Sequence, residues 1–225
     1  VLWMRGPKRI QSRRFLIIEA TMCGRFSLVA TVEDIQQALG RDMRVIGDRP
    51  EPRYNIAPGS RVFAAVRTED AYRSGWIEWG IQPKWTNRRL INAKHEKYMA
   101  GSGFWKDWRP CLVPASGIYE WSHEKKAFHI QRTDKELLLM AAIWGRCDDG
   151  EPRLVVLTES AADWMEPIHP RMPLLLSQGG ADDWCRNGRV GETLSEELIV
   201  AKRVGAYVNR VGNEGPMCWE GDDRY

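Results

Sequence analysis

The stretch "PCLVPASGIYEW", residues 110–121, has the β-branched and aromatic content of a strand and sets the fold expected for the chain. Outward from it, segments of the same kind recur with few residues between them. They are "RVFAAVR" (61–67), "GWIEWGI" (75–81), "AFHIQR" (127–132), "LLLMAAIW" (137–144), "RLVVLTE" (153–159) and "MPLLLS" (172–177). Because short turns join these segments, we predict an α+β fold with a curved, mostly antiparallel sheet or open barrel-like core and short peripheral helices.

Helices are expected to be short and to lie at the edges of this sheet. In "TVEDIQQALG" (31–40), Thr31 can cap a helix, Glu33 and Asp34 suit its positive end, and Gly40 can stop it. Further short helices are predicted near 94–107, 160–167, 180–187 and 194–200, and "RYNIAPGS" (53–60) is predicted to be a turn-rich connection.

The charge of the chain is unevenly distributed. Its 225 residues, 43% of them hydrophobic, suit a single domain with a sizeable core, and the net charge is +3. Residues 1–22 hold five basic residues and one acidic residue, a net +4, which leaves −1 for the rest. A globally basic nucleic-acid binder is therefore not indicated, whereas a local basic groove is compatible with the sequence.

The cysteines argue against a zinc site and against a disulfide framework. They are Cys23, Cys111, Cys147, Cys185 and Cys218, with no two closer than 33 residues. An odd number at wide spacing favours a reducing compartment, so we expect a cytoplasmic protein. The sequence has no glycine-rich phosphate motif and no apolar run of about 20 residues, so neither a cofactor nor a membrane span is expected.

The stretch "ATMCGRFS" (20–27) resembles a translation start inside the chain, since Met22 directly precedes Cys23. We expect residues 1–21 to be a disordered leader, either non-native or propeptide-like, and residues 22–225 to form one domain. An Arg-rich, acid-poor leader is also compatible with a transit peptide. The alternatives differ chemically, because only an N-terminal cysteine carries an amine and a thiol on adjacent carbons.

Four polar residues stand among apolar or unusual neighbours. They are Cys23, Asn92 in "LINAKHEK", Glu120 in "GIYEWS" and His169 in "EPIHPRMP". Each has an ordinary structural explanation: a buried thiol, a turn residue, a solvent-facing carboxylate and a loop histidine. An inward-facing Glu120 would instead be desolvated, which would raise its pKa and suit it to proton transfer near pH 7. Together the four make a plausible set for covalent catalysis.

Several motifs occur in the order found in the SOS-response-associated peptidase (SRAP) family, which this chain resembles from Met22 to Cys218. They are "MCGRF", "RYNIAPG", "WG" followed by "PKW", "INAKHE", "GIYEW", "MAAIW", "IHPRMP" and "VNRVGNEGPMC". The resemblance implies a single SRAP domain over residues 22–225. It further implies that the protein bonds covalently to abasic sites in single-stranded DNA and so shields them during the DNA damage response.

The resemblance also assigns roles to the four polar residues. Cys23 is similar to the family nucleophile, whose amine and thiol would close a thiazolidine ring on the aldehyde of an abasic sugar. Asn92 resembles the residue that orients the amine and the opened sugar. Glu120 resembles the proton donor and acceptor, and His169 the group that assists proton transfer and stabilises the sugar hydroxyl or phosphate.

For DNA binding, the resemblance points to Arg25, Trp85, Lys94 and Arg171. The arginines are similar to residues that meet the DNA backbone, and Trp85 resembles an aromatic wedge against which a base stacks. The chain departs from the family where Lys94 stands in place of an arginine, because lysine keeps the charge but loses the bidentate fork. Lys97 likewise replaces a small hydroxyl residue.

Three functions remain open from the sequence. The first is an abasic-site crosslinking protein with AP lyase and autopeptidase activities. The second is a thiol peptidase that cuts the Met22–Cys23 bond to remove its own leader. The third is a non-covalent single-strand binder that keeps the leader. For the first function, the expected partner is single-stranded DNA that contains abasic sites, and neither a membrane nor a metal is expected. The protein is expected to be a cytoplasmic monomer that is associated with the nucleoid when it is bound to DNA.

Overall fold

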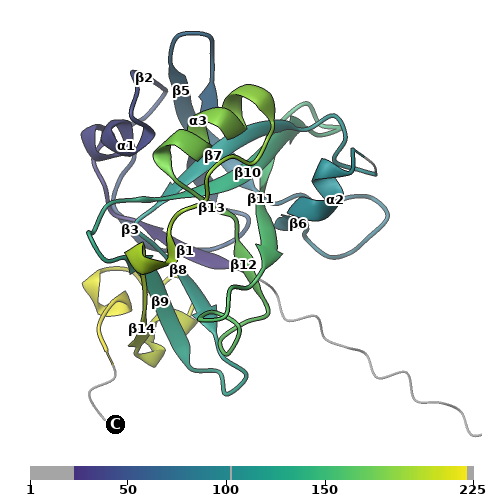
Figure 1. Ribbon diagram of the computed structural model, residues 1–225. Helices are drawn as coiled ribbons and strands as arrows, with labels where there is room; N and C mark the ends of the chain where they lie inside the picture. Colours follow the sequence, from purple (N-terminus) through teal and green to yellow (C-terminus); the bar gives the residue numbers. More distant parts are fainter. Residues whose placement is uncertain (1–22, 102, 222–225) are drawn as a thin grey trace, which may run out of the picture.

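The computed structural model describes residues 23–101 and 103–221, and the predicted leader of residues 1–21 lies outside them. Within this part of the chain, two sheets meet at the centre of the molecule (Figure 1). The first sheet has the order β14 (Ile199–Val204), β9 (Ala127–Arg132), β8 (Gly117–Trp121), β1 (Arg25–Leu28) and β3 (Arg53–Ile56). All of its pairings are antiparallel.

The second sheet is larger and mixed. Its order is β12 (Arg171–Pro173), β11 (Pro152–Ser160), β10 (Leu138–Arg146), β7 (Arg109–Ala115), β4 (Arg61–Arg67), β5 (Tyr72–Trp79) and β2 (Met43–Ile46). In addition, β13 (Leu175–Leu176) pairs with β10, and β6 (Asn92–Lys94) pairs with β11. The sheet curls until β11 meets β5 in parallel, yet β12 and β2 remain as edge strands among the described residues. The predicted fold class is confirmed, and the curved sheet is not a closed barrel.

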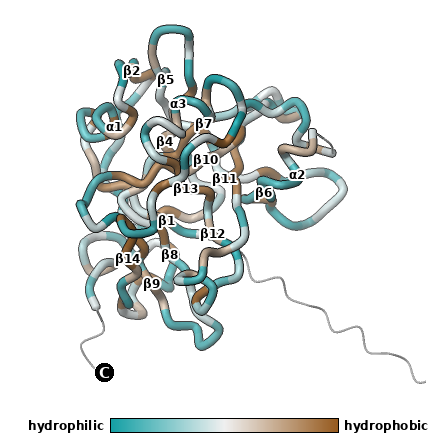
Figure 2. Tube along the Cα trace, in the orientation of Figure 1, coloured by the Kyte–Doolittle hydropathy of each residue, from teal (hydrophilic) through white to brown (hydrophobic). Residues whose placement is uncertain are grey.

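The stretch 110–121 connects the two sheets. Its first part is β7 of the second sheet and its last part is β8 of the first, with Ser116 between them. Ser116 Oγ accepts the backbone N–H of Val29 at 2.8 Å, so the crossing point is held against the end of β1. The next residue must be small, because a Cβ on Gly117 would lie 2.1 Å from His129 Nε2. Figure 2 shows the hydrophobic residues along the central strands and the hydrophilic ones in the outer loops.

The helices lie at the periphery. They are α1 (Val32–Leu39), α2 (His95–Met99) and α3 (Gln178–Asn187), with 3₁₀ turns η1 (Glu196–Leu198), η2 (Ala206–Asn209) and η3 (Pro216–Cys218). Helix α1 confirms its prediction, since Thr31 and Asp34 form a capping box and Gly40 ends the helix in the left-handed region at φ +64°.

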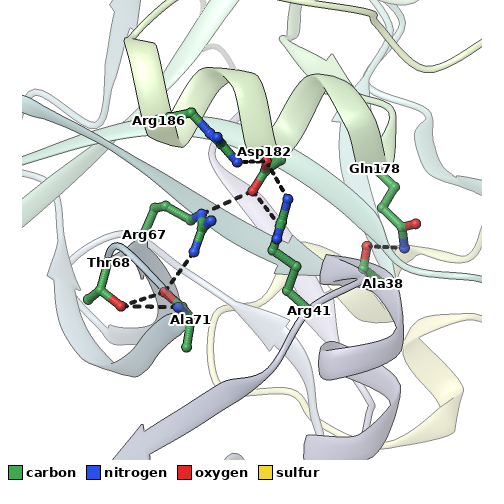
Figure 3. Close-up of polar contacts among 8 residues, drawn as sticks. All are labelled: Ala38, Arg41, Arg67, Thr68, Ala71, Gln178, Asp182 and Arg186. Carbon is green, nitrogen blue, oxygen red and sulfur yellow. Dashed lines mark hydrogen bonds and ion pairs between the residues drawn. The ribbon is translucent and has the colours of Figure 1, made fainter.

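Helix α3 is fastened to the strands through one carboxylate (Figure 3). Asp182 Oδ1 lies 2.9 Å from Arg41 Nε and 3.0 Å from Arg67 Nε. Its Oδ2 accepts from Arg186, one turn later in the helix, at 2.8 Å. Three arginines, one after α1, one at the end of β4 and one in α3 itself, therefore converge on a single side chain, which is 17% exposed. Nearby, Gln178 donates to the carbonyl of Ala38 at the end of α1.

Several predicted elements were wrong. Residues 160–167 form the end of β11 and turns, because Pro167 and Pro170 supply no N–H for a helix. The helix near 94–107 is limited to α2, since Gly101 and Gly103 adopt φ values of +63° and +84°. The segment 194–200 is η1 followed by β14, because pairing with β9 outweighs local helix preference. The connection 53–60 begins with strand β3 before it turns.

Candidate active site

Cys23 lies two residues before the start of β1, at the point where the two sheets meet. It is 5% exposed, and beside it is a small cavity lined by Phe26 and Ile118 of the first sheet and by Met140 and Val156 of the second. Its φ is +37°, in the left-handed region that non-glycine residues rarely adopt. The backbone at Cys23 is thus held in an uncommon conformation, a feature typical of functional sites.

Glu120 is the immediate polar neighbour of Cys23. The antiparallel register of β1 and β8 pairs Arg25 with Tyr119, which brings the start of β1 beside Glu120. Glu120 is 2% exposed and accepts hydrogen bonds from both the thiol and the backbone N–H of Cys23. Burial raises its pKa to about 7, and these hydrogen bonds only partly oppose that rise. The sequence left open whether Glu120 faces solvent or the interior, and this geometry agrees with the inward-facing, desolvated alternative.

The thiol of Cys23 is kept protonated by the same surroundings. Burial raises its pKa well above the ordinary value, the negative charge of Glu120 adds to this, and Arg171 opposes it. Thiolate is therefore scarce at neutral pH, so the sulfur could act as a nucleophile only if a base took its proton. Glu120 is placed to be that base, because it already contacts the thiol.

His169 is held by the backbone of Arg171. Its Nδ1 lies 2.9 Å from the carbonyl oxygen of Arg171 and 3.1 Å from the backbone nitrogen of the same residue. In either tautomer Nδ1 is thus engaged, which leaves Nε2 as the ring nitrogen available for chemistry. The side chain is 6% exposed and lies in the connection that leads into β12.

Arg171 is linked to the Cys23 site by its charge but is also bound to Glu96. Its Nη1 and Nη2 donate to the two Glu96 oxygens at 2.7 and 3.0 Å, and Nη2 also donates to the carbonyl of Thr158. This bidentate pair lowers the pKa of Glu96 to about 2. The predicted DNA contact would therefore require Arg171 to exchange Glu96 for a phosphate.

Asn92 and Lys94 reach the same region through β6. This strand pairs in parallel with β11, with Asn92 opposite Val156 and Lys94 opposite Thr158. Val156 lines the Cys23 cavity and Thr158 holds Arg171, so β11 connects these residues to the site. Asn92 is partly buried, while Lys94 is exposed at the start of α2.

Arg25 and Trp85, the other two predicted DNA contacts, have different settings. Arg25 Nη1 donates to Asn55 Oδ1 at 2.8 Å, and the guanidinium lies 5.6 Å from the ring centroid of Trp121. Trp85 is 67% exposed in the connection between β5 and β6, where its ring is 6.1 Å from that of Phe104. Among the described residues, none that lines the groove beside Trp85 also lines the Cys23 cavity.

The structure therefore brings Cys23 and Glu120 into contact, places Arg171 where its charge acts on the Cys23 thiol, holds His169 against the backbone of Arg171, and leaves Trp85 on a separate groove. Sequence reasoning did not single out Asn55 or Glu96, although each lies inside a motif that it quoted. Their partners are 30 and 75 residues away in sequence, so no local pattern could reveal them.

The described residues hold no group of three or more His, Cys, Asp or Glu side chains arranged to bind a metal. No helix in this part of the chain is long and apolar enough to cross a membrane.

Comparison with solved structures shows the fold to be shared. A protein from Bacteroides thetaiotaomicron superposes with a TM-score of 0.72 at 19% identity, over 88% of this chain and 99% of the other. A phage-related protein from Bordetella bronchiseptica gives a TM-score of 0.65 at 26% identity, over 81% and 94% of the two chains.

Comparison of sequences identifies the family. "Abasic site processing protein YedK" of Escherichia coli (strain K12) is 36% identical over 188 residues, which cover 78% of this chain and 84% of the relative. "Abasic site processing protein YoqW" of Bacillus subtilis (strain 168) is 25% identical, over 88% of this chain and 99% of the relative. A family profile described as "SOS response associated peptidase (SRAP)" matches residues 22–211, and this chain belongs to that family.

Proposed function

We propose that this protein processes abasic sites in DNA by bonding to them covalently through Cys23. The working form would begin at Cys23 after removal of Met22, and its partner would be single-stranded DNA. The observation that carries the proposal is the contact of Glu120 with both the nitrogen and the sulfur of Cys23. Two further findings support it: the family profile begins its match at residue 22, and the relatives are named abasic site processing proteins.

The chemistry needs one group that gives and takes protons beside a 1,2-aminothiol. An abasic sugar opens to an aldehyde, whose carbon is attacked by the neutral amine of an N-terminal Cys23. An α-amine with a reference pKa near 8 is partly neutral at pH 7. Glu120 in its acid form protonates the departing hydroxyl, water leaves, and an imine forms.

Ring closure completes the adduct. The imine is formed protonated; the Cys23 sulfur attacks its carbon, the C=N electron pair moves to the nitrogen, and the thiol proton passes to the Glu120 carboxylate, which regains its acid form. The product is a five-membered thiazolidine, formed with the net loss of one water. A pKa of about 7 lets Glu120 serve as acid in the first step and base in the second. We assign Nε2 of His169 to the sugar hydroxyl or phosphate, and Asn92 to orientation of the amine.

The proposed DNA contacts are Arg25, Lys94, Arg171 and Trp85. Guanidinium and ammonium groups suit phosphate, and an exposed tryptophan suits stacking with a base, which contributes about 1–3 kcal/mol per base. Lys94 and Trp85 are exposed, so they are available to DNA without rearrangement.

A second activity is favoured by the same contact. If residues 1–22 precede Cys23, its nitrogen is an amide and cannot form an imine. The thiol can then attack the Met22 carbonyl, and Glu120 can protonate the nitrogen as it leaves. This transfer to sulfur leaves the Cys23 amine free, and water would then hydrolyse the thioester to release the leader and restore the thiol. This self-cleavage would be a peptidase activity that prepares the crosslinking site.

The test is to incubate protein that begins at Cys23 with an abasic single-stranded oligonucleotide and to separate heat-stable adducts on a denaturing gel. We expect an adduct with the wild type, none with Cys23→Ala, and slow formation with Glu120→Gln. The matched control is protein whose intact mass shows that residues 1–22 remain attached throughout the incubation, and it should form none. An adduct that survives Cys23→Ala, or equal yields with and without the leader, would overturn the proposal.

Self-cleavage is tested separately by the intact mass of the 225-residue chain. Loss of residues 1–22 from the wild type but not from Cys23→Ala supports it. Equal loss from both proteins, or retention in both, excludes it.

A further inference from the structure

Asn55 is a buried polar residue that the proposed chemistry does not use. It lies in β3 and is 3% exposed. Its amide nitrogen lies 3.2, 3.1 and 2.9 Å from the carbonyl oxygens of Val208, Arg210 and Asn213. The two N–H groups of the amide therefore donate to three carbonyl oxygens of the C-terminal segment, and neither N–H is left without an acceptor.

The acceptor side of the same amide is directed at Arg25. Asn55 Oδ1 accepts from Arg25 Nη1 at 2.8 Å, and the same Nη1 donates to the Val208 carbonyl at 3.0 Å. The guanidinium also lies over the ring of Trp121, whose indole N–H donates to Asn209 Oδ1 at 2.7 Å. The hydrogen bonds of Nη1 and the contact with the Trp121 ring therefore fix the orientation of the Arg25 guanidinium.

The other terminal nitrogen of Arg25 is left for a ligand. Between residues 23 and 221, residue 102 aside, no hydrogen bond uses Arg25 Nη2. A guanidinium whose orientation is already fixed loses little side-chain entropy when it binds a phosphate. Arg25 is also one of the residues that line the Cys23 cavity, which relates a phosphate held there to the reacting sugar.

We propose that Asn55 is a positioning residue that orients Arg25 toward a DNA phosphate; the proposal rests on the DNA binding proposed above. The position needs an acceptor facing Arg25 and donors facing three carbonyls, and an asparagine supplies both from one side chain. Aspartate would still accept from Arg25 but would turn a second oxygen toward the carbonyls. Alanine would supply neither group.

This difference makes the proposal testable with four variants: Asn55→Ala, Asn55→Asp, Arg25→Ala and the double variant N55A/R25A. The probe is an intact single-stranded oligonucleotide without an abasic site, and the readout is its dissociation constant over a range of salt concentrations. Asn55→Ala and Arg25→Ala should each weaken binding about tenfold, as for loss of a hydrogen bond to a charged group. Each should also lower the salt slope by about 0.7, the value for one phosphate on a single strand.

Two comparisons separate positioning from a general loss of structure. The double variant should bind no more weakly than Arg25→Ala, because both changes remove one contact. Asn55→Asp should bind within about threefold of the wild type, although its melting temperature falls because a carboxylate faces three carbonyl oxygens. The proposal fails if Asn55→Ala keeps the wild-type salt slope, if the losses multiply in the double variant, or if Asn55→Asp binds as weakly as Arg25→Ala. If Asn55→Ala does not fold, the comparison of Asn55→Asp with Arg25→Ala decides alone.

Failure of this inference is distinguishable from failure of the proposed function. If the wild type binds no intact oligonucleotide and forms no adduct, the proposed function is wrong. If the wild type binds the intact oligonucleotide and forms the adduct, but the Asn55 variants give any of the three contradicting results above, only the role of Asn55 is wrong.

Discussion

Replacing Glu120 with glutamine should change how the stability of the protein depends on pH. Burial raises the pKa of Glu120 from 4.5 to about 7 in the folded protein. Because the folded state binds this proton more tightly than the unfolded state, the favourable contribution is complete below pH 4.5 and is lost as pH rises through 7. One pKa unit corresponds to about 1.4 kcal/mol, so the loss is about 3 kcal/mol. Glutamine has nearly the same shape and does not titrate, so Glu120→Gln should lack this dependence.

The assay is urea unfolding of both proteins at several pH values between 4.5 and 8. The free energy of unfolding of the wild type, minus that of Glu120→Gln, should fall by about 3 kcal/mol across this range. Glu124→Gln is the matched control, because Lys126 lowers the pKa of Glu124 below its ordinary value, so this carboxyl does not titrate near pH 7. A difference between wild type and Glu120→Gln that stays flat from pH 4.5 to 8 would refute the reasoning.

The same substitution should affect the proposed reaction. Removal of a general acid and base lowers rates by about 10²–10⁴-fold, so Glu120→Gln should form adduct at least 100-fold more slowly. The wild-type rate should also show a pH dependence near 7 that Glu120→Gln lacks. Equal rates, or the same pH profile in both proteins, would show that Glu120 does not transfer the proton.

Two further predictions concern other parts of the chain. A Cβ on Gly180 would lie 1.9 Å from the Glu192 carbonyl oxygen, so Gly180→Ala should lower the free energy of unfolding, measured in urea, by about 2–3 kcal/mol. A Cβ on Gly179 would meet nothing closer than 3.9 Å, so Gly179→Ala should raise that free energy by about 0.5 kcal/mol. Equal effects of the two substitutions would contradict this packing argument. Glu96→Gln should free Arg171 to bind a phosphate, so binding of intact single-stranded DNA should become tighter and its dependence on salt steeper by about 0.7. Weaker binding would show instead that Glu96 orients Arg171 for DNA.

The fold was largely predictable because its strands are apolar and its first helix is capped. Thr31 and Gly40 identify α1 from the sequence, and the strand segments from 61 to 159 lie close to their predicted positions. The division of 110–121 between two sheets was not predictable, since a continuous apolar run does not show which partner each half will pair with. It depends instead on contacts of Ser116 and Gly117 with distant residues.

The site was predictable to a smaller extent. Motif order brought attention to Cys23 and Glu120, but the aromatic neighbours of Glu120 left open whether its side chain faces solvent or the interior, and the structure shows it buried. The pairing of Arg171 with Glu96 was not expected, because the sequence suggested only that Arg171 suits phosphate. The catalytic and DNA-binding roles of the predicted residues stay predictions, and the measurements above address them.

The most direct test of the central claim is the intact mass of the adduct between protein beginning at Cys23 and an abasic oligonucleotide. The account predicts the sum of the two masses less one water, unchanged by borohydride, with the modification mapped to Cys23 after proteolysis. An adduct that gains two hydrogens on borohydride treatment would be an open imine. That result, or attachment at any other residue, would contradict ring closure on Cys23.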